Sequence, residues 1–124
     1  MHEATIAQSI LQIAALKLLE TGSSDIALKV RVKIGQFRNV DGDSLSFAFD
    51  SLKGAYPGLK TCQLETQAVA AEAWCRTDRH RYNPCIENAF CCEQCGSGIG
   101  KIIYGEELDF VELITESGNH QQGT

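Results

Sequence analysis

The most constraining feature of the sequence is a polar segment rich in cysteine. Five of the six cysteines lie between residues 75 and 95, together with three arginines, one histidine and few apolar side chains. Such a segment buries too little apolar surface to offset the conformational entropy lost on folding. Because a bound metal ion supplies stabilisation of another kind, the pattern predicts a small metal-stapled lobe.

Composition and the amino-terminal pattern narrow the function classes. Residues 1–20 lack the basic start, unbroken apolar run and cleavage site of a signal peptide. We therefore expect a reducing, cytoplasmic location, where paired cysteines are more often metal ligands than disulfides. No apolar run has the roughly 20 residues that a transmembrane helix needs. A net charge of −5 without a basic block disfavours nucleic acid and favours a metal ion or a protein partner.

Hydrophobic periodicity predicts the secondary structure of the rest of the chain. Apolar residues at helical spacing predict a helix over residues 4–20, and Asp41 is suited to cap a second helix that ends near Gly54. Strict alternation from Ile26 to Ile34 predicts a strand with one buried face, and further strands are expected over residues 61–69, 102–104 and 107–114. Cys62 stands apart from the cluster and fits a core position.

The order of these elements predicts an α/β (α+β) fold with an inserted lobe. At 124 residues the chain can bury one modest core, made of a small sheet and two helices. We assign residues 1–70 plus 101–116 to this domain, residues 71–100 to a zinc-ribbon-like lobe, and residues 117–124 to a flexible tail.

The cysteine spacing indicates a zinc site. Cys92 and Cys95 form a close pair followed by Gly96, and this arrangement supplies two corners of a tetrahedral site on a tight turn. Cys75 is a suitable third ligand. The fourth position is open, and ligand preference and spacing rank the candidates in the order His80, Asp78, Cys85 and Cys91. Four protein ligands would make the site structural rather than catalytic.

The amino terminus offers a second metal site of different chemistry. In Met1-His2-Glu3 the free amine, the amide nitrogen of His2 and its imidazole can chelate one ion, with the Glu3 amide or carboxylate near enough to complete a plane. Square-planar nitrogen ligation suits nickel(II) or copper(II). A motif of three residues is too short to establish a site on its own.

Four segments in register resemble the HypA/HybF family of nickel metallochaperones. They are Met1 to Ile10, Ile34 to Val40, Leu45 to Phe49, and the Cys92-x-x-Cys95-Gly96 turn. The resemblance implies a nickel-binding α/β domain with an inserted zinc domain, and a carrier rather than an enzyme. It further implies delivery of nickel to the large subunit of [NiFe] hydrogenase, cooperation with the GTPase HypB and, in some organisms, service to urease maturation proteins.

The resemblance assigns roles to individual residues. His2 matches the nickel ligand, with the Met1 amine and the Glu3 backbone beside it. Three zinc ligands match Cys75, Cys92 and Cys95, whereas Asp78 falls where the family has its fourth cysteine. This departure implies that His80 or another cysteine has replaced it.

Two other functions compete with nickel delivery. A zinc-ribbon module that binds nucleic acid or a transcription partner would need a larger basic face than Arg76, Arg79 and Arg81 provide. A thiol redox sensor would need exposed cysteines of low pKa. We find no catalytic motif, and the glycines at 96, 98 and 100 lack the strand-helix context of a phosphate-binding loop.

Overall fold

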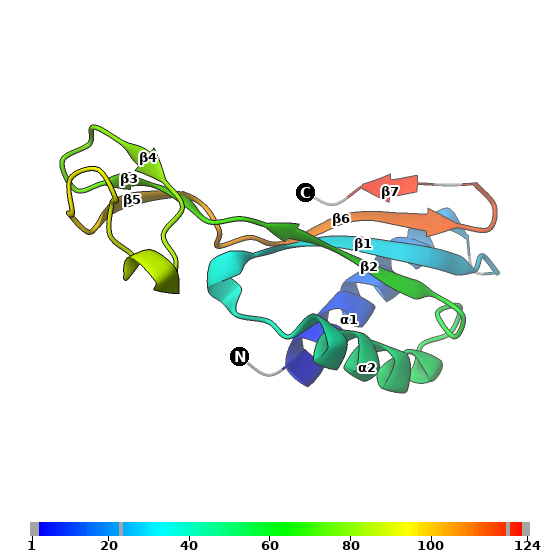
Figure 1. The fold of residues 1–124 in the computed structure, drawn as a ribbon. Coiled ribbons are helices and arrows are strands. Elements are labelled where there is room, and N and C mark those ends of the chain that lie inside the picture. Colours follow the sequence, from blue (N-terminus) through cyan, green and yellow to red (C-terminus); the bar gives the residue numbers. More distant parts are fainter. Residues whose placement is uncertain (1–2, 23, 119, 123–124) are drawn as a thin grey trace. The chain divides into compact units, whose positions relative to one another are not determined.

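The chain forms two sheets and two helices. The structure, a computed structural model, describes residues 3–22, 24–118 and 120–122. A four-stranded sheet has the order β2-β1-β6-β7, and a three-stranded sheet has the order β4-β3-β5 (Figure 1). The elements are α1 (Glu3–Thr21), β1 (Ala27–Gly35), α2 (Gly42–Leu52), β2 (Gln63–Val69), β3 (Glu72–Cys75), β4 (Arg81–Tyr82), β5 (Ile99–Tyr104), β6 (Leu108–Thr115) and β7 (His120–Gln122), with short 3₁₀ turns η1 (Gln36–Arg38), η2 (Lys53–Ala55) and η3 (Ile86–Asn88).

These elements divide into two compact units. Residues 1–33, 40–67 and 109–124 form what we call the α+β unit, and residues 34–39 and 68–108 form what we call the lobe. The lobe is therefore larger than the segment 71–100 assigned from the sequence. Residues 34–39 belong to it because Gln36 Oε1 accepts hydrogen bonds from the Ala71 amide at 2.8 Å and from Asn83 Nδ2 at 3.1 Å. β5 belongs to it because it pairs with β3.

The two predicted helices are present, and both lie on one face of the four-stranded sheet (Figure 1). The Asp41 side chain caps α2 as expected, accepting hydrogen bonds from the backbone amides of Asp43 and Ser44. Leu45 and Phe49 of α2 are fully buried. The buried face of α1 is formed by Ile6, Ala7, Ile10, Leu11, Ala14 and Leu18.

The strand predicted over residues 26–34 is β1, but its buried face begins later than the alternation suggests. Val30 and Val32 are buried as expected, whereas Ile26 and Leu28 are 37% and 43% exposed. Ile26 precedes the strand, whose first residue Ala27 is fully buried and donates its amide to Gly58 O at 2.9 Å. The prediction for Cys62 is confirmed, since burial excludes it from solvent and raises the pKa of its thiol to about 11.

A charged network joins three strands of the four-stranded sheet. Arg31 on β1 donates to the carboxylates of Glu65 on β2 and Glu112 on β6. The hydrogen bond from Arg31 lowers the pKa of Glu65, and Lys29 lies 3.8 Å from the same carboxylate. These cross-strand pairs fix the register of polar side chains on the sheet.

The tail differs from the prediction of a flexible segment. β7 pairs antiparallel with β6, in the register Leu113 with Gln121. The turn before β7 is anchored by Asp25, whose carboxylate accepts hydrogen bonds from the Ser117 amide at 3.3 Å and the Ser117 hydroxyl at 2.7 Å.

Neither helix in the described part of the chain combines the length and the apolar character that a membrane span needs.

Candidate metal centre

Four side chains of metal-binding type converge in the lobe. The ligand atoms of Cys75, His80, Cys92 and Cys95 all lie within 4.8 Å of one another. Nδ1 of His80 lies 3.7 Å from Cys75 Sγ and 3.6 Å from Cys92 Sγ. Cys75 and Cys92 are buried, His80 is half-buried, and Cys95 is exposed at the surface. The thiols are free, so all of them are available as ligands.

The second half of the cluster sits on a tight turn that the sequence foreshadows. Gly96 N donates to Cys92 O at 2.7 Å, and Cys92 N donates to Ser97 O at 2.8 Å. Gly96 adopts a φ of +73°, a conformation in which glycine has no side-chain penalty. The turn therefore points the Cys92 and Cys95 thiols to the same side.

The first half is built on a similar turn with one altered position. Cys75 N donates to His80 O at 2.9 Å, which repeats the bond from Cys92 to the carbonyl five residues later. Here the left-handed residue is Asp78, with a φ of 63°, and its amide donates to Cys75 O at 2.8 Å. Aspartate tolerates this conformation better than most residues. The chain thus reverses at Asp78, and His80 follows two residues later beside Cys75.

β5 passes close to the first turn. A Cβ atom at Gly100 would lie 2.8 Å from Cys75 O and 3.0 Å from the Arg76 Cα, so any larger residue would displace this backbone. In addition, Arg76 N donates to Gly98 O at 2.8 Å. β5 therefore closes the lobe against Cys75, and Gly100 is the position at which this close approach requires glycine.

Two hydroxyl groups tune the thiols. Thr77 Oγ1 lies 3.0 Å from Cys75 Sγ and, with backbone amides at residues 79 and 80, holds the pKa of Cys75 at about 5. Ser97 Oγ lies 2.9 Å from Cys95 Sγ and holds that pKa at about 7. The Cys95 and Cys75 thiolates in turn raise the pKa of His80. Neither hydroxyl was identified from the sequence, although each belongs to a residue two positions after a cysteine.

Burial has the opposite effect on the remaining thiol. Removal from solvent raises the pKa of Cys92. The cluster therefore contains two thiols that ionise readily and one, Cys92, that ionises less readily unless a bound cation displaces its proton. This combination favours a cation at the centre of the four side chains.

The structure separates the four sequence candidates for the last position. Within the described part of the chain, His80 belongs to the group, and Asp78, Cys85 and Cys91 do not. At the amino terminus, Met1 and His2 lie outside the described residues. Glu3 is described: its Oε2 accepts the Asp41 amide at 3.1 Å, and this bond lowers the pKa of Glu3.

The fold and this cluster define a small metal-binding protein of α+β type with a cysteine-rich lobe. A family model described as "Hydrogenase/urease nickel incorporation, metallochaperone, hypA" matches residues 1–115. The chain belongs to the HypA family, whose members are metallochaperones rather than enzymes. The family resemblance drawn from the sequence is thereby confirmed.

Individual relatives agree with this assignment. The chain is 33% identical over 115 residues to the hydrogenase maturation factor HypA of Chloroflexus aggregans, covering 93% of this chain and 99% of the relative. It is 31% identical over 117 residues to HypA of a Roseiflexus species, covering 94% and 93%. The solution structure of the nickel metallochaperone HypA from Helicobacter pylori has a TM-score of 0.62 at 22% identity, covering 91% and 96%, and confirms the predicted fold.

Proposed function

We propose that this protein carries nickel(II) for the maturation of [NiFe] hydrogenase and binds it at the amino terminus. The ligands are the Met1 amine, the His2 amide and imidazole, and the Glu3 backbone. The observation that carries the proposal is that the family match begins at residue 1 and so includes the Met-His-Glu motif. Nitrogen ligands of this kind suit nickel in a planar arrangement.

The surroundings of Glu3 favour its backbone over its side chain as a ligand. The carboxylate already accepts a hydrogen bond from the Asp41 amide at 3.1 Å. Glu3 is the first residue of α1, and the first amides of a helix have no partner within the helix. The Glu3 amide therefore has no bond within the helix and interacts with the Glu3 carboxylate instead, so nickel can use it without breaking a turn.

In the lobe we propose a structural zinc(II) site formed by Cys75, His80, Cys92 and Cys95. A tetrahedral zinc ion bound at about 2.3 Å from sulfur and 2.0 Å from nitrogen separates these two ligand types by about 3.5 Å. The distances from His80 Nδ1 to two of the sulfurs are 3.7 and 3.6 Å. The donor set thus fits zinc, and its four ligands leave no position for a substrate.

The partners follow from the same function. We propose that a HypB-type GTPase and the large subunit of [NiFe] hydrogenase exchange nickel with this chain in the cytoplasm, and that urease maturation proteins are further recipients where that enzyme occurs. A nucleic-acid function finds less support, because Arg81 is paired with Glu72 at 2.6 Å and packs over Trp74.

Nickel titration of the protein with a native, free amino terminus tests the proposal. We expect His2→Ala to abolish nickel binding in the range where the wild type binds one ion. His120→Ala is the matched control and should bind nickel like the wild type. Equal affinity of His2→Ala and wild type would rule out the amino-terminal site. An added amino-terminal tag should also abolish binding, because it converts the amine into an amide.

A further inference from the structure

The short turn between the two halves of the metal cluster displays apolar side chains. Residues 85–91 contain η3 and lead directly into Cys92. Ile86 in this turn is 81% exposed, the highest value among the large apolar side chains that the structure describes, and Phe90 is 43% exposed. Both belong to the lobe. Ile86 therefore contributes little to packing, and the exposed parts of both side chains lose favourable burial while they face water.

The backbone of this turn is strained. Ala89 and Phe90 are consecutive and have φ angles of 54° and 62°. Residues other than glycine seldom adopt this left-handed conformation, because it brings the side chain too close to the backbone. Strain of this kind persists only where the surroundings enforce it, and it concentrates at functional sites.

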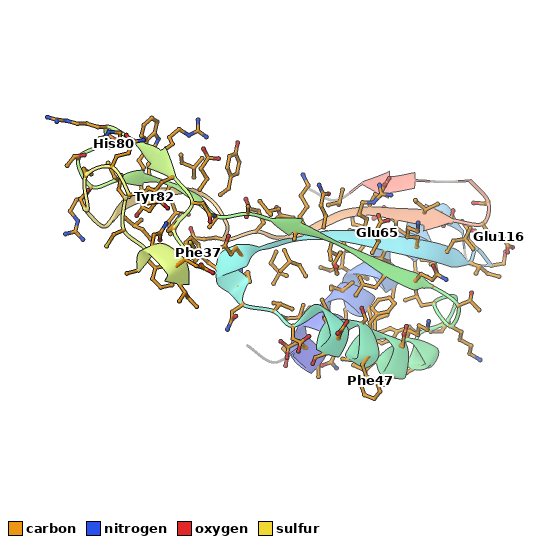
Figure 2. The ribbon with its side chains drawn as sticks, viewed as in Figure 1. Phe37, Phe47, Glu65, His80, Tyr82 and Glu116 are labelled. Carbon is orange, nitrogen blue, oxygen red and sulfur yellow. The ribbon has the colours of Figure 1, made fainter. Side chains whose placement is uncertain are left out.

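Hydrogen bonds enforce the conformation. Asn88 Oδ1 accepts the amides of Cys85 and Phe90, both at 3.0 Å, and Asn88 Nδ2 donates to Asn83 O at 2.9 Å. Tyr82, labelled in Figure 2, donates its hydroxyl to Phe90 O at 2.7 Å. Ile86 and Phe90 are therefore held on a rigid support, and their presentation does not depend on ordering a loose loop.

The apolar pair has acidic neighbours. Glu87 lies between Ile86 and Phe90 in the sequence and is exposed, as is Glu93. Glu93 also lines a cavity of about 300 Å³ together with Asn88 and Cys85 of the turn. His80 and Arg81 line the same cavity, and the Arg81 guanidinium is paired with Glu72. The turn thus carries apolar contact area and the Glu87 carboxylate, and the cavity beside it adds the Glu93 carboxylate.

We propose that Ile86, Phe90, Glu87 and Glu93 form a docking surface for a partner protein with an apolar pocket bordered by lysine or arginine. The pocket would take the two apolar side chains, and the basic border would pair with the two carboxylates. Because the turn is already ordered, little conformational entropy is lost on binding. A second copy of this chain is a poorer occupant, since face-to-face pairing would bring four carboxylates together.

Binding measurements on the zinc-loaded full chain test this surface. The probes are the HypB-type GTPase and the hydrogenase large subunit, so the choice of probes rests on the proposed function. We expect Ile86→Ser and Phe90→Ser each to weaken binding to one of these probes by about 10-fold or more. Phe47→Ser is the matched control, because Phe47 is 75% exposed on α2 and points away from the sheet (Figure 2).

Several results would overturn the proposal. These are unchanged affinity in Ile86→Ser, an equal loss in Phe47→Ser, or no binding of either probe by the wild type. Glu87→Lys and Glu93→Lys should weaken binding further, and tighter binding would contradict a basic border. A dimer of the wild type that Ile86→Ser dissolves would assign the surface to a second copy instead.

The same variants separate this proposal from the nickel function. Nickel affinity should be unchanged in Ile86→Ser, and docking should be unchanged in zinc-loaded, nickel-free His2→Ala. If His2→Ala binds nickel normally while Ile86→Ser still loses the partner, the nickel site is wrong and the docking surface stands.

Discussion

The α+β unit and the lobe bury different kinds of side chain. In the α+β unit the fully buried residues include Leu11, Leu45, Phe49 and Leu113. In the lobe they are small or are themselves candidate metal ligands, namely Ala71, Ala73, Cys75, Pro84 and Cys92. Burial of large apolar side chains is the main stabilising contribution in a domain, so the first unit can rely on it and the second cannot. We therefore expect the lobe to depend on metal ligation and hydrogen bonds instead.

Zinc removal should produce the largest difference in stability between the two units. A strong chelator is expected to unfold the lobe, because zinc binding contributes on the order of 10 kcal/mol to small domains of this kind. Hydrogen exchange followed by NMR should show loss of amide protection in β3, β4 and β5, while α1, α2 and the four-stranded sheet stay protected. Simultaneous loss of protection in both units would show that they are not separately stabilised.

Core truncation should have the converse effect. Phe49→Ala removes a fully buried ring from α2, and we expect the free energy of unfolding of the α+β unit to fall by about 3–5 kcal/mol. Zinc affinity should not change. The matched control is Phe47→Ala two residues earlier, which removes a ring that is 75% exposed and should alter stability by less than about 0.5 kcal/mol. Equal effects of the two changes would contradict the burial that the structure assigns.

Removal of the hydroxyls beside the thiols should have an intermediate effect, which we expect on zinc affinity. Ser97→Ala and Thr77→Val remove partners that lie 2.9 and 3.0 Å from Cys95 Sγ and Cys75 Sγ. Loss of an outer-shell partner of a metal ligand costs roughly 10–100-fold in metal affinity. Competition with a chromophoric chelator measures the change. Ser51→Ala on α2, whose hydroxyl donates to Phe47 O, should retain wild-type zinc affinity.

Acidification should have the smallest effect on stability, and Asp25 is the residue through which we expect it to act. Hydrogen bonds, first from the Ser117 hydroxyl, lower the pKa of this carboxyl in the folded protein. Because the unfolded value is about 3.9, the ionised group stabilises the fold above that pH, and its contribution is lost as the pH falls below about 4. In thermal unfolding, Asp25→Asn should therefore be less stable than wild type at pH 7 and approach it on acidification. A difference in stability between wild type and Asp25→Asn that grows in acid would contradict the lowered pKa of Asp25.

The two units also differed in how far the sequence predicted them. α2 was predictable because Asp41 is a strong cap and Leu45 and Phe49 repeat at helical spacing. β3 and β4 were missed because they are short and lie among charged residues and cysteines, where no alternation is visible. The contribution of Gln36 to the lobe is a long-range hydrogen bond that no local pattern indicates. The role of Asp78 as a left-handed turn residue is visible only in its backbone conformation.

The most direct test of the account is the identity of the zinc ligands. X-ray absorption spectroscopy of the zinc-loaded protein should show three sulfur ligands and one imidazole nitrogen. We predict that His80→Ala loses the nitrogen signal and releases zinc to a chelator much faster than the wild type. Asp78→Ala should keep the nitrogen signal and release zinc as slowly as the wild type. Four sulfur ligands, or faster zinc loss in Asp78→Ala than in His80→Ala, would contradict the ligand set that the structure brings together.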